Sequence, residues 1–550
     1  MDGPRMRWWG WGVDGHDAPL PAAAVALLRD ELGVEPAHHA PVSLDAVDIP
    51  EPALPAAARA RLTEVVGAAN VRDDRLARVT HSAGRGYPDL VRLRSGRGLV
   101  APDAVVLPGT REEVARVLEA CADSGVAVVP FGGGTSVVGG VEPLRGPFAA
   151  AVSVDLARLH GLLELDERSQ LATFGAGTPG PDVERLLGAR GLTLGHFPQS
   201  FEFSTIGGWA AARSAGQAST GYGRMDELAV DLRAATPAGE LVTRRVPASA
   251  AGPSLRELLL GSEGTLGIIT DVTVRVRPRP AQQRFEAWSL PRFAAGSEAL
   301  RELEQAGAAP DVARLSDESE TRLSLLLASH PAATRLLRAY LRARGHAPGC
   351  LAILGFDGEP VQVARRRAQA RPILRRHGAL ALGRAPGAAW AKGRFHGAYL
   401  RDELLRRGVL VDTLETATTW TQLGEVHGAV SRALREALAA RGTRALVMCH
   451  VSHLYPTGAS LYVTFLARQQ AGEELAQWHA AKAAATDAIC AAGATLTHHH
   501  AVGRDHAPWL PREVGELGVE ALRALKARLD PAGIMNPGKL LLDPGHDPGA

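Results

Sequence analysis

Short apolar runs alternate with amphipathic stretches through the first half of the chain, and this alternation predicts strands and helices in turn. The runs expected to form strands are rich in alanine, valine, leucine and isoleucine and cover 104–108, 126–130, 150–155, 171–175, 229–234, 241–246 and 268–276. The stretches expected to form helices carry apolar residues at helical spacing and cover 22–32, 56–69, 110–124 and 181–190. A mixed α+β fold follows.

The clearest of these units runs from 104 to 130. Thr110 and Glu113 form a capping-box pattern at the start of its helix, and Gly125 ends that helix. The strand that follows opens directly into a run of glycines. The unit is therefore strand–helix–strand with a glycine-rich loop at its end.

A proline–arginine sequence, Arg277-Pro278-Arg279-Pro280, is the best candidate for a domain boundary. Beyond it, strand and helix patterns alternate again. The expected parts are an N-terminal helical segment (1–96), a first domain (97–279), a cap or substrate domain (280–485) and a C-terminal segment returning to the first domain (486–550).

Composition narrows the class of protein. The 550 residues carry a formal net charge of +2, which argues against a nucleic-acid binder because such proteins usually carry a basic patch. No apolar run reaches the ~18 residues needed to span a bilayer, and the N-terminal residues lack the apolar stretch of a signal peptide. We therefore expect a cytoplasmic protein with no nucleic-acid partner.

The strongest chemical signal is Pro130–Gly140, with the sequence Pro-Phe-Gly-Gly-Gly-Thr-Ser-Val-Val-Gly-Gly. A phosphate group needs several converging main-chain N–H donors, and glycine permits the close approach and positive φ values involved. The Thr135 and Ser136 hydroxyls add donors, each worth about 1.5–3 kcal/mol to a charged phosphate. The loop is neither a Walker A sequence nor a Rossmann fingerprint, and by itself it also fits a glycine-rich hairpin.

Two further clusters of small and hydroxyl residues, Gln199–Gly208 and Gly261–Ile269, follow along the chain. One such loop is a weak indication, but three in this order are specific. With them the chain resembles the vanillyl-alcohol oxidase / p-cresol methylhydroxylase superfamily of FAD flavoproteins. The resemblance implies an α+β fold, in which a two-subdomain FAD-binding domain of the p-cresol methylhydroxylase type carries an α/β cap built on an antiparallel sheet.

The same resemblance implies which residues contact FAD. They are Pro130, Phe131, Gly132, Gly133, Gly134, Thr135, Ser136, Gln199, Ser200, Phe201, Glu202, Phe203, Ser204, Thr205, Ala212, Arg213, Ser214, Ala215, Glu263, Gly264, Thr265, Leu266, Gly267, Ile268 and Ile269. Covalent attachment in this superfamily commonly uses a histidine or cysteine, and the loop at 130–140 contains neither. We expect non-covalent FAD.

A narrower resemblance, to the alkylglycerone-phosphate synthase (alkyldihydroxyacetone-phosphate synthase) family, covers nearly the whole chain. Its motifs are Arg-Trp-Trp-Gly-Trp-Gly (7–12), Phe-Ser-Thr-Ile-Gly-Gly-Trp (203–209), Ala-Tyr-Leu-Arg-Asp (398–402), Gly-Ala-Ser-Leu-Tyr (458–462) and Thr-His-His-His-Ala-Val-Gly (497–503). In that family the flavin N5 forms a covalent adduct with C1 of acyl-dihydroxyacetone phosphate, a fatty acid leaves and a fatty alcohol enters, with no net redox change. The resemblance thus implies an FAD-dependent transferase of ether lipid synthesis.

The family's functional residues carry over onto matching positions. The catalytic residues that the resemblance implies are Tyr462, His498, His499, His500, Arg401 and Arg314. Tyr462 would be the proton donor and acceptor, Arg401 would contact the substrate, and Arg314 would support the site. The basic residues that commonly follow the histidines are partly replaced, with Asp505 and His506 after Arg504.

Read without the family, these residues leave alternatives open. A phenol has a pKa near ~10 and needs nearby cations to act as a base. Three histidines and an arginine could supply them around Tyr462, which otherwise is a packed strand tyrosine. Arg401 and Arg314 suit a substrate phosphate or carboxylate, or are surface residues of an arginine-rich chain.

The consecutive histidines raise a geometric problem. On an ideal strand His498 and His500 share one face and His499 lies on the other, so a bend is needed to bring all three into one pocket. Their alternative role is metal binding, with His450 and His453 as further ligands. No carboxylate motif accompanies them, and no metal is expected.

The residues also allow two other function classes. The main alternative is an FAD-dependent D-2-hydroxyacid dehydrogenase or oxidase, although residues 450–458 lack the His-x-Gly-Asp-Gly-Asn-x-His motif common in those enzymes. A flavin carrier or sensor without turnover is a third class. Trp8, Trp9 and Trp11 either dip into a membrane interface or, as we expect, pack the terminal segment onto the core. The expected partners are a small lipid-phosphate or hydroxyacid substrate, peripheral membrane contact and a second subunit in a homodimer.

Overall fold

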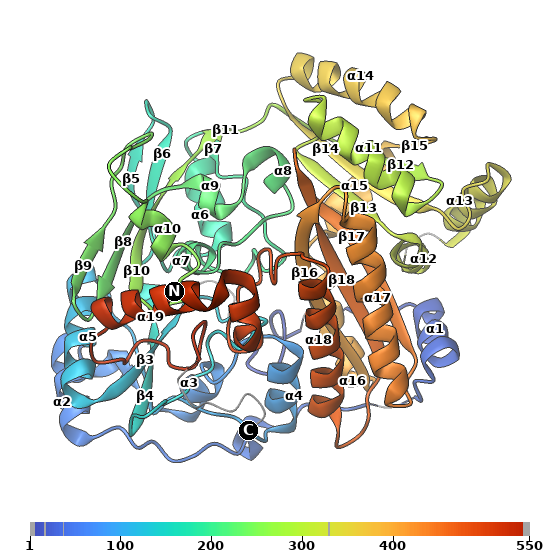
Figure 1. Ribbon diagram of the computed structural model, residues 1–550. Helices are drawn as coiled ribbons and strands as arrows, with labels where there is room; N and C mark the ends of the chain where they lie inside the picture. The colour runs from blue at the N-terminus through green and yellow to red at the C-terminus, as the bar shows by residue number, and fades with distance from the viewer. Residues whose placement is uncertain (1–5, 16–17, 37, 328–330, 543–550) are drawn as a thin grey trace.

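The computed structural model describes residues 6–15, 18–36, 38–327 and 331–542, which form two halves side by side (Figure 1). The strands and helices predicted in the first half of the chain all form, with ends displaced by a few residues. The largest displacement is in the strand expected at 241–246, which runs from Gly239 to Val242.

The first half contains a small sheet that ends in the glycine-rich loop. Its strands, in spatial order, are β1 (Val71–Arg72), β2 (Ala104–Val106), β4 (Ala150–Asp155) and β3 (Val126–Phe131). Strands β2, β4 and β3 are parallel, with α5 (Arg111–Ser124) as the helix between β2 and β3. Thr110 caps α5 by accepting from the Glu113 amide at 3.1 Å, as the capping-box pattern predicts.

A second, antiparallel sheet completes this half. Its strands, in spatial order, are β5 (Leu162–Asp166), β6 (Leu171–Gly175), β10 (Ile268–Arg275), β8 (Ala229–Thr236) and β9 (Gly239–Val242). A short pair, β7 (Leu192–Thr193) and β11 (Arg277–Pro278), lies where the chain leaves for the second half. The helices of this half and of the N-terminal segment are α1 (Ala22–Leu32), α2 (Ala56–Val66), α3 (Arg75–Thr80), α4 (Tyr87–Ser95), α6 (Gly180–Gly188), α7 (Ile206–Ala211), α8 (Ser219–Tyr222), α9 (Met225–Leu228) and α10 (Leu255–Leu259).

The second half is built on one antiparallel sheet. Its strands, in spatial order, are β15 (Leu380–Gly383), β12 (Gln282–Leu290), β14 (Cys350–Gly358), β13 (Val312–Ser316), β17 (Ala445–Tyr455), β18 (Gly458–Arg468) and β16 (Val409–Thr419). The helices of this half are α11 (Phe293–Gln305), α12 (Glu318–Leu326), α13 (Pro331–Ala343), α14 (Pro360–Arg376), α15 (Arg384–Gly393), α16 (Gly397–Arg406), α17 (Leu423–Ala440) and α18 (Glu474–Ala491). Helices α17 and α18 cover one face of this sheet (Figure 1).

Period-two alternation divides the central strand between two environments. In β18, Leu461, Val463 and Phe465 belong to the core beneath the helices. The alternate residues Tyr462 and Thr464 line a cavity on the opposite face. The sheet therefore offers one face to its own core and the other to the first half.

The end of the chain runs back to the first half. Helix α19 (Leu510–Leu529) lies across that half (Figure 1). After it, Met535 bridges to Val128 of β3, and the Asn536 amide donates to the Val128 carbonyl at 2.8 Å. The segment that follows α19 thus lies against the strand that carries the glycine-rich loop.

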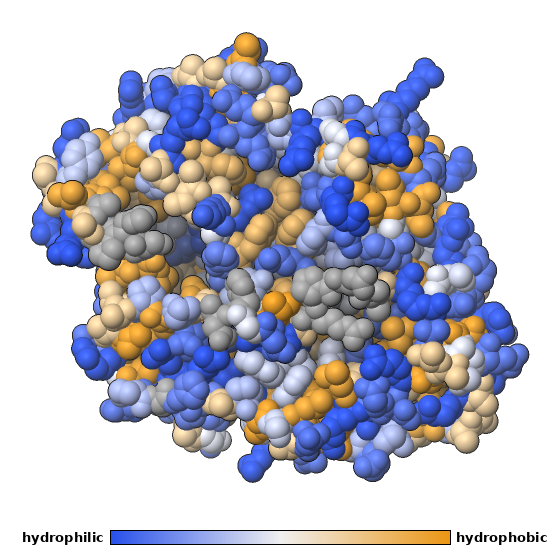
Figure 2. Space-filling model, turned by 180° about the vertical axis from the view of Figure 1, so that it is seen from behind, coloured by the Kyte–Doolittle hydropathy of each residue, from blue (hydrophilic) through white to orange (hydrophobic). Residues whose placement is uncertain are grey.

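On the back of the molecule, hydrophilic residues are interspersed with several hydrophobic patches, one of them around a hollow in the upper part of the view (Figure 2). Among the residues that the structure describes, no helix combines the length and the apolar character required to cross a bilayer.

Candidate active site

A cavity of about 610 Å³ is lined by both halves of the protein. The predicted cofactor residues on its wall are Pro130, Phe131, Gly132, Gly133, Gly134, Thr135, Ser136, Gln199, Ser200, Ser204, Thr205, Ala212, Ser214, Ala215, Glu263, Gly264, Gly267 and Ile269. The remaining ones, which lie off the wall, are Phe201, Glu202, Phe203, Arg213, Thr265, Leu266 and Ile268. Of the predicted catalytic residues, all but His498 line the same cavity.

The glycine-rich loop presents free main-chain donors to this cavity. In the described part of the chain, none of the five amides from Gly132 to Ser136 donates to a protein acceptor. A Cβ placed on Gly133 would lie 2.0 Å from the Phe203 carbonyl oxygen, so no other residue fits there without a shift of the backbone. Gly134 has a φ of 64°, which glycine adopts without strain. This cradle of unpaired amides fits the diphosphate of FAD.

Glu263 joins the cofactor loops to the end of the histidine segment. Its carboxylate accepts from the amides of Val502 at 2.8 Å and Gly503 at 2.7 Å. The side-chain amide of Asn536 donates to the Glu263 carbonyl at 2.6 Å. Burial raises the pKa of the Glu263 carboxyl to about 7, although the two amides oppose that rise. The cofactor loop, the histidine segment and the segment after α19 are therefore joined at one residue, Glu263, through its carboxylate and its main-chain carbonyl.

Three side chains stand in one row across the sheet. Glu415 of β16 is the direct partner of Tyr462 in β18, and Tyr462 is also the direct partner of His450 in β17. Directly opposed residues of antiparallel strands point to the same face. The ring of His450 stacks on that of Tyr462, with centroids 4.9 Å apart.

The histidine segment bends, as predicted, and Glu415 fixes the bend. Its carboxylate, 2 % exposed, accepts from the amides of His498 at 2.6 Å, His499 at 3.1 Å and His500 at 2.8 Å. The His499 and His500 rings lie 5.9 Å and 5.5 Å from the Tyr462 ring, the first stacked and the second edge-on. The rings of His499 and His500 therefore both lie beside the phenol, although a straight strand would point these neighbours to opposite faces.

The protonation states differ from the expectation of a tyrosine surrounded by histidine cations. Burial lowers the pKa of His499 and holds the pKa values of His498 and His500 well below the ordinary value. Burial also raises the pKa of Tyr462, against the Thr413 hydroxyl and the Arg401 charge. At neutral pH the site thus combines a protonated phenol with uncharged imidazoles that can accept a proton.

Arg314 is held by two residues that the sequence did not single out for this role. Its guanidinium donates to the His450 Nε2 at 3.0 Å and forms an ion pair with Glu320. His450 Nδ1 contacts the Glu320 carboxylate at 2.9 Å. Because Arg314 can only donate, Nε2 of His450 is the acceptor and Nδ1 carries the proton. Burial alone would raise the pKa of Glu320, but His450 and Arg314 hold it well below its usual range.

Arg401 is buried but keeps a position on the cavity wall. It lies in α16, is 8 % exposed, and pairs with Asp412 of β16 at 3.3 Å. Its guanidinium also donates to the Arg85 carbonyl at 3.0 Å. Trp478 donates its indole N–H to the other oxygen of Asp412 at 2.6 Å. The guanidinium is therefore held in place, which contradicts the surface alternative and suits an anionic ligand group.

Away from the polar groups the cavity wall becomes apolar. Its residues there lie in or next to α1 and α12, in α16 and in strands β16, β17 and β18, and are Leu20, Ala24, Leu27, Leu28, Leu323, Leu327, Leu404, Val411, Met448 and Leu466. One cavity thus joins a phosphate-binding loop, a polar reaction centre and a hydrocarbon-lined end.

The N-terminal tryptophans pack onto the core, as expected. Trp11 is 6 % exposed and donates its main-chain amide to Asp402 at 2.9 Å. The guanidinium groups of Arg7 and Arg94 lie over the Trp9 ring, at 4.6 Å and 5.3 Å from its centroid. The N-terminal segment is thus anchored to α16 through Asp402.

Two domain families match the chain. Residues 102–244 match the FAD binding domain, and residues 279–540 match the C-terminal domain of FAD linked oxidases. FAD is therefore the cofactor of this protein, and the prediction of an FAD-dependent enzyme is confirmed.

The chain is similar over most of its length to individual proteins of one family. The alkyldihydroxyacetonephosphate synthase of Dictyostelium discoideum is 36% identical over 479 residues, covering 86% of this chain and 78% of the relative. A solved structure of an alkyldihydroxyacetonephosphate synthase superposes with a TM-score of 0.84 at 31% identity, covering 97% of this chain and 98% of the other. p-Cresol methylhydroxylase with substrate bound gives a TM-score of 0.67 at 15% identity, covering 89% of this chain and 97% of the other. The last match shows a shared fold, which confirms the predicted fold class.

Proposed function

The chain belongs to the alkyldihydroxyacetonephosphate synthase family of FAD-dependent enzymes, and on that premise we propose that it exchanges the acyl group of acyl-dihydroxyacetone phosphate for a fatty alcohol. The observation that carries the proposal is the single cavity shared by the glycine-rich loop, Tyr462 and an apolar end. The exchange needs all three features: the loop to hold the cofactor, the polar residue to move protons, and the apolar end to hold the hydrocarbon chain of the substrate.

The substrate's polar and apolar parts have separate places. Arg401 and Arg314 both line the cavity and both are fixed by carboxylates, so they are the groups we assign to the phosphate end and its surroundings. The hydrocarbon chain then extends along the apolar wall, where each buried CH₂ contributes about 0.8 kcal/mol to binding.

The cofactor is held by the loop at 132–136 without a covalent bond. His196, a histidine near the second cofactor loop, is fully buried beside Trp209 and lies off the cavity wall. When bound, FAD supplies the isoalloxazine ring nitrogen that serves as the nucleophile of the exchange. The chain's own residues hold the substrate, exclude water and move protons.

Proton movement is the role we assign to Tyr462. Its raised pKa keeps the hydroxyl protonated, so it can donate to an oxygen that develops negative charge. The neutral His499 and His500 rings beside it can take a proton from the entering alcohol. The proton that the alcohol loses is thereby available to the carboxylate that leaves as fatty acid, so no net proton is gained or lost.

Exchange of labelled fatty alcohol into acyl-dihydroxyacetone phosphate, without an electron acceptor, tests the proposal directly. We expect exchange in the wild type and loss of exchange in Tyr462→Phe, with flavin content unchanged. Bleaching of the flavin by D-lactate or D-2-hydroxyglutarate under anaerobic conditions, with no exchange, would instead establish the hydroxyacid dehydrogenase alternative.

We also propose peripheral contact with a lipid surface through α13. This helix projects from the edge of the second half (Figure 1) and exposes 74% of Leu336 and 45% of Tyr340. Arg335, Arg338 and Arg342 lie along the same helix. Apolar side chains beside arginines are typical of helices that lie in a membrane interface.

The position of α13 supports this role. It follows α12, whose residue Leu323 lines the apolar end of the cavity. Flotation with anionic phospholipid vesicles tests the proposal: Leu336→Glu should weaken binding, whereas Leu517→Glu, at an exposed leucine of α19, should not. Equal loss in both variants would contradict it.

Two further proposals concern assembly and domain division. We propose a homodimer, on the family resemblance alone, and light scattering of the purified protein tests it. We also propose that residues 97–279 with 486–550 hold FAD, that 280–485 form the cap, and that 1–96 form a helical segment. Limited proteolysis should then cut first near 279–280.

A further inference from the structure

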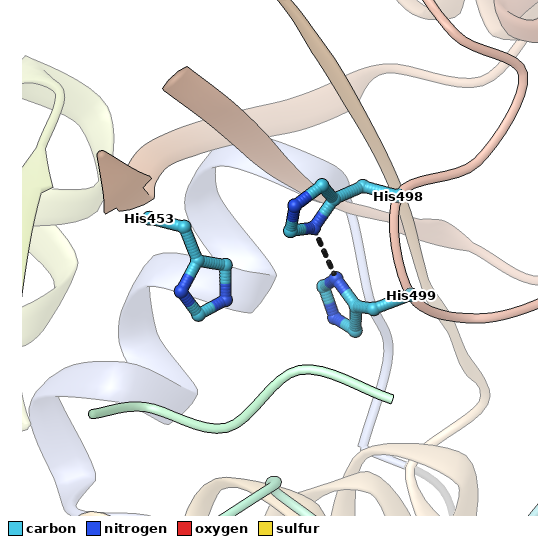
Figure 3. Close-up of side chains that lie close together, drawn as sticks. All are labelled: His453, His498 and His499. Carbon is cyan, nitrogen blue, oxygen red and sulfur yellow. Dashed lines mark hydrogen bonds between the residues drawn. The ribbon is translucent and has the colours of Figure 1, made fainter. Parts of the chain in front are cut away.

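Three histidine rings converge at the edge of the cavity. His453 comes from β17, whereas His498 and His499 come from the bent segment after α18 (Figure 3). One ring nitrogen from each lies within 4.8 Å of the other two. The centroids of the His453 and His498 rings are 5.1 Å apart, and those of His453 and His499 are 6.0 Å apart.

A β-bulge brings His453 into this group. The pairing of β17 with β18 shifts register between Val451 and Leu454. As a result, the neighbours Ser452 and His453 both line the cavity, although successive residues of a regular strand point to opposite faces. The His453 ring is therefore aimed at the histidine segment by a specific feature of the backbone.

His453 also lacks a partner that its burial would demand. It is 3 % exposed, and its Nδ1 has no hydrogen-bond partner in the described part of the chain. A buried polar nitrogen without a partner costs about 1–3 kcal/mol. That nitrogen points away from His498 and His499 in Figure 3, whereas Nε2 faces them, so Nε2 is the nitrogen that a ligand shared by the three rings would bind.

We propose that His453, His498 and His499 bind a borderline divalent cation such as Zn²⁺, and that the bound ion inhibits the enzyme. Binding of the ion does not depend on the proposed function. The inhibition does depend on it, because the ion would occupy imidazoles that the exchange needs. The ion is an inhibitor from solution and not a resident cofactor.

The donor set selects the kind of ion. Three imidazole nitrogens suit Zn²⁺, Cu²⁺ or Ni²⁺, whereas Mg²⁺ and Ca²⁺ require oxygen ligands. Each neutral imidazole offers one nitrogen lone pair to a metal ion. His453 and His499 line the cavity, which leaves a fourth position open to water or to a substrate oxygen.

The surroundings resemble those of a supported metal site. The Tyr455 hydroxyl contacts His498 Nε2 at 2.6 Å, which fixes that ring. Nδ1 of His498 lies 3.0 Å from Nδ1 of His499 and is hydrogen-bonded to it (Figure 3), so a bound ion would replace that hydrogen bond. Glu415 holds the backbone of both segment histidines and brings a negative charge within 3.3 Å of His499 Nδ1. That charge offsets part of the repulsion of a cation by Arg224, whose charge also acts on all three histidines.

Binding and inhibition are measured separately on the FAD-loaded enzyme. In equilibrium dialysis we expect one Zn²⁺ per chain, and we expect His453→Gln to weaken binding at least about tenfold, since loss of outer-shell partners alone costs that much. His479→Gln, at an exposed histidine of α18, serves as the matched control and should bind like the wild type. Flavin absorbance and a melting curve establish that each variant is folded.

The outcomes separate the two proposals. Zn²⁺ should block fatty alcohol exchange and Mg²⁺ at the same concentration should not. If His453→Gln binds Zn²⁺ as tightly as the wild type, if no Zn²⁺ binds, or if Mg²⁺ inhibits equally, the site is not a metal site. Should exchange be absent altogether, the dialysis result still decides the binding.

Discussion

Glu415 and Tyr462 face each other across β16 and β18, so the carboxylate that fixes the histidine segment lies directly beside the phenol that the histidines flank. The sheet thereby sets the distance between two elements of the site that are far apart in the sequence. Burial alone would raise the pKa of Glu415, but the hydrogen bonds that its carboxylate accepts from the Thr497 hydroxyl and the three histidine amides hold it well below its usual range. The carboxylate is ionised and acts as an acceptor only.

Glu415→Gln tests this relationship. A glutamine keeps the shape but can accept at one atom only, so at least one histidine amide loses its partner, at about 1–3 kcal/mol. We expect the rate constant of exchange to fall at least about tenfold, by that energy, while the flavin stays bound. Glu425→Gln, at an exposed residue of α17, should exchange like the wild type. An unchanged rate in Glu415→Gln would show that the carboxylate does not position the histidines.

Gly133→Ala tests the phosphate cradle. The added Cβ would meet the Phe203 carbonyl oxygen at 2.0 Å, so the loop must move and its amides lose their common target. Each lost bond to a charged phosphate costs about 1.5–3 kcal/mol, and we expect FAD affinity to fall at least about tenfold. Absorbance of the purified protein measures the flavin content. Gly424→Ala in α17, where a Cβ meets nothing within 4 Å, should retain full flavin.

The secondary structure of the cofactor half could be predicted from the sequence because it depends on residues close together in the chain. Helix α5 and the strands on either side follow from residue spacing alone, and so does the loop that begins after Phe131. The need for a bend at the histidines was also visible, since a straight strand would separate His499 from its neighbours.

The partners of these residues could not be predicted because strand pairing decides them. An acid at position 415 is unremarkable until β16 is known to lie beside β18. His453 reaches the cavity only through a register shift that its own sequence does not reveal. The exposed helix α13 was not predicted, although its apolar and basic residues show helical spacing around Leu336 and Tyr340.

Acid sensitivity follows from the buried histidines, and His506 is the clearest case. Burial, helped by Lys482, lowers the pKa of His506 to about 3. The unfolded chain, with a pKa near ~6.5, takes up the proton first. The stabilisation is therefore complete above pH ~6.5 and is lost as the pH falls toward about 3.

His506→Gln should remove this dependence. The wild type should lose about 2 kcal/mol of unfolding free energy at this site between pH 7.5 and pH 5. The glutamine amide can still donate to the Ala501 carbonyl, which the His506 ring contacts at 3.1 Å. Urea unfolding at the two pH values measures the difference. If wild type and variant lose the same free energy, His506 is not a source of the acid sensitivity.

The apolar end of the cavity should set the length of hydrocarbon chain that the enzyme accepts. Ala24 of α1 is 3 % exposed and lines this end, so Ala24→Phe would fill part of it. Each displaced CH₂ loses about 0.8 kcal/mol, so displacing two of them lowers kcat/KM about tenfold for a long-chain alcohol. A short-chain alcohol, which does not reach Ala24, should react as in the wild type. Ala23→Phe, on the exposed side of the same helix, is the matched control and should leave both substrates unaffected. An equal loss with long and short alcohols in Ala24→Phe would mean that the chain lies elsewhere, because a steric block at the far end cannot act on a substrate that stops short of it.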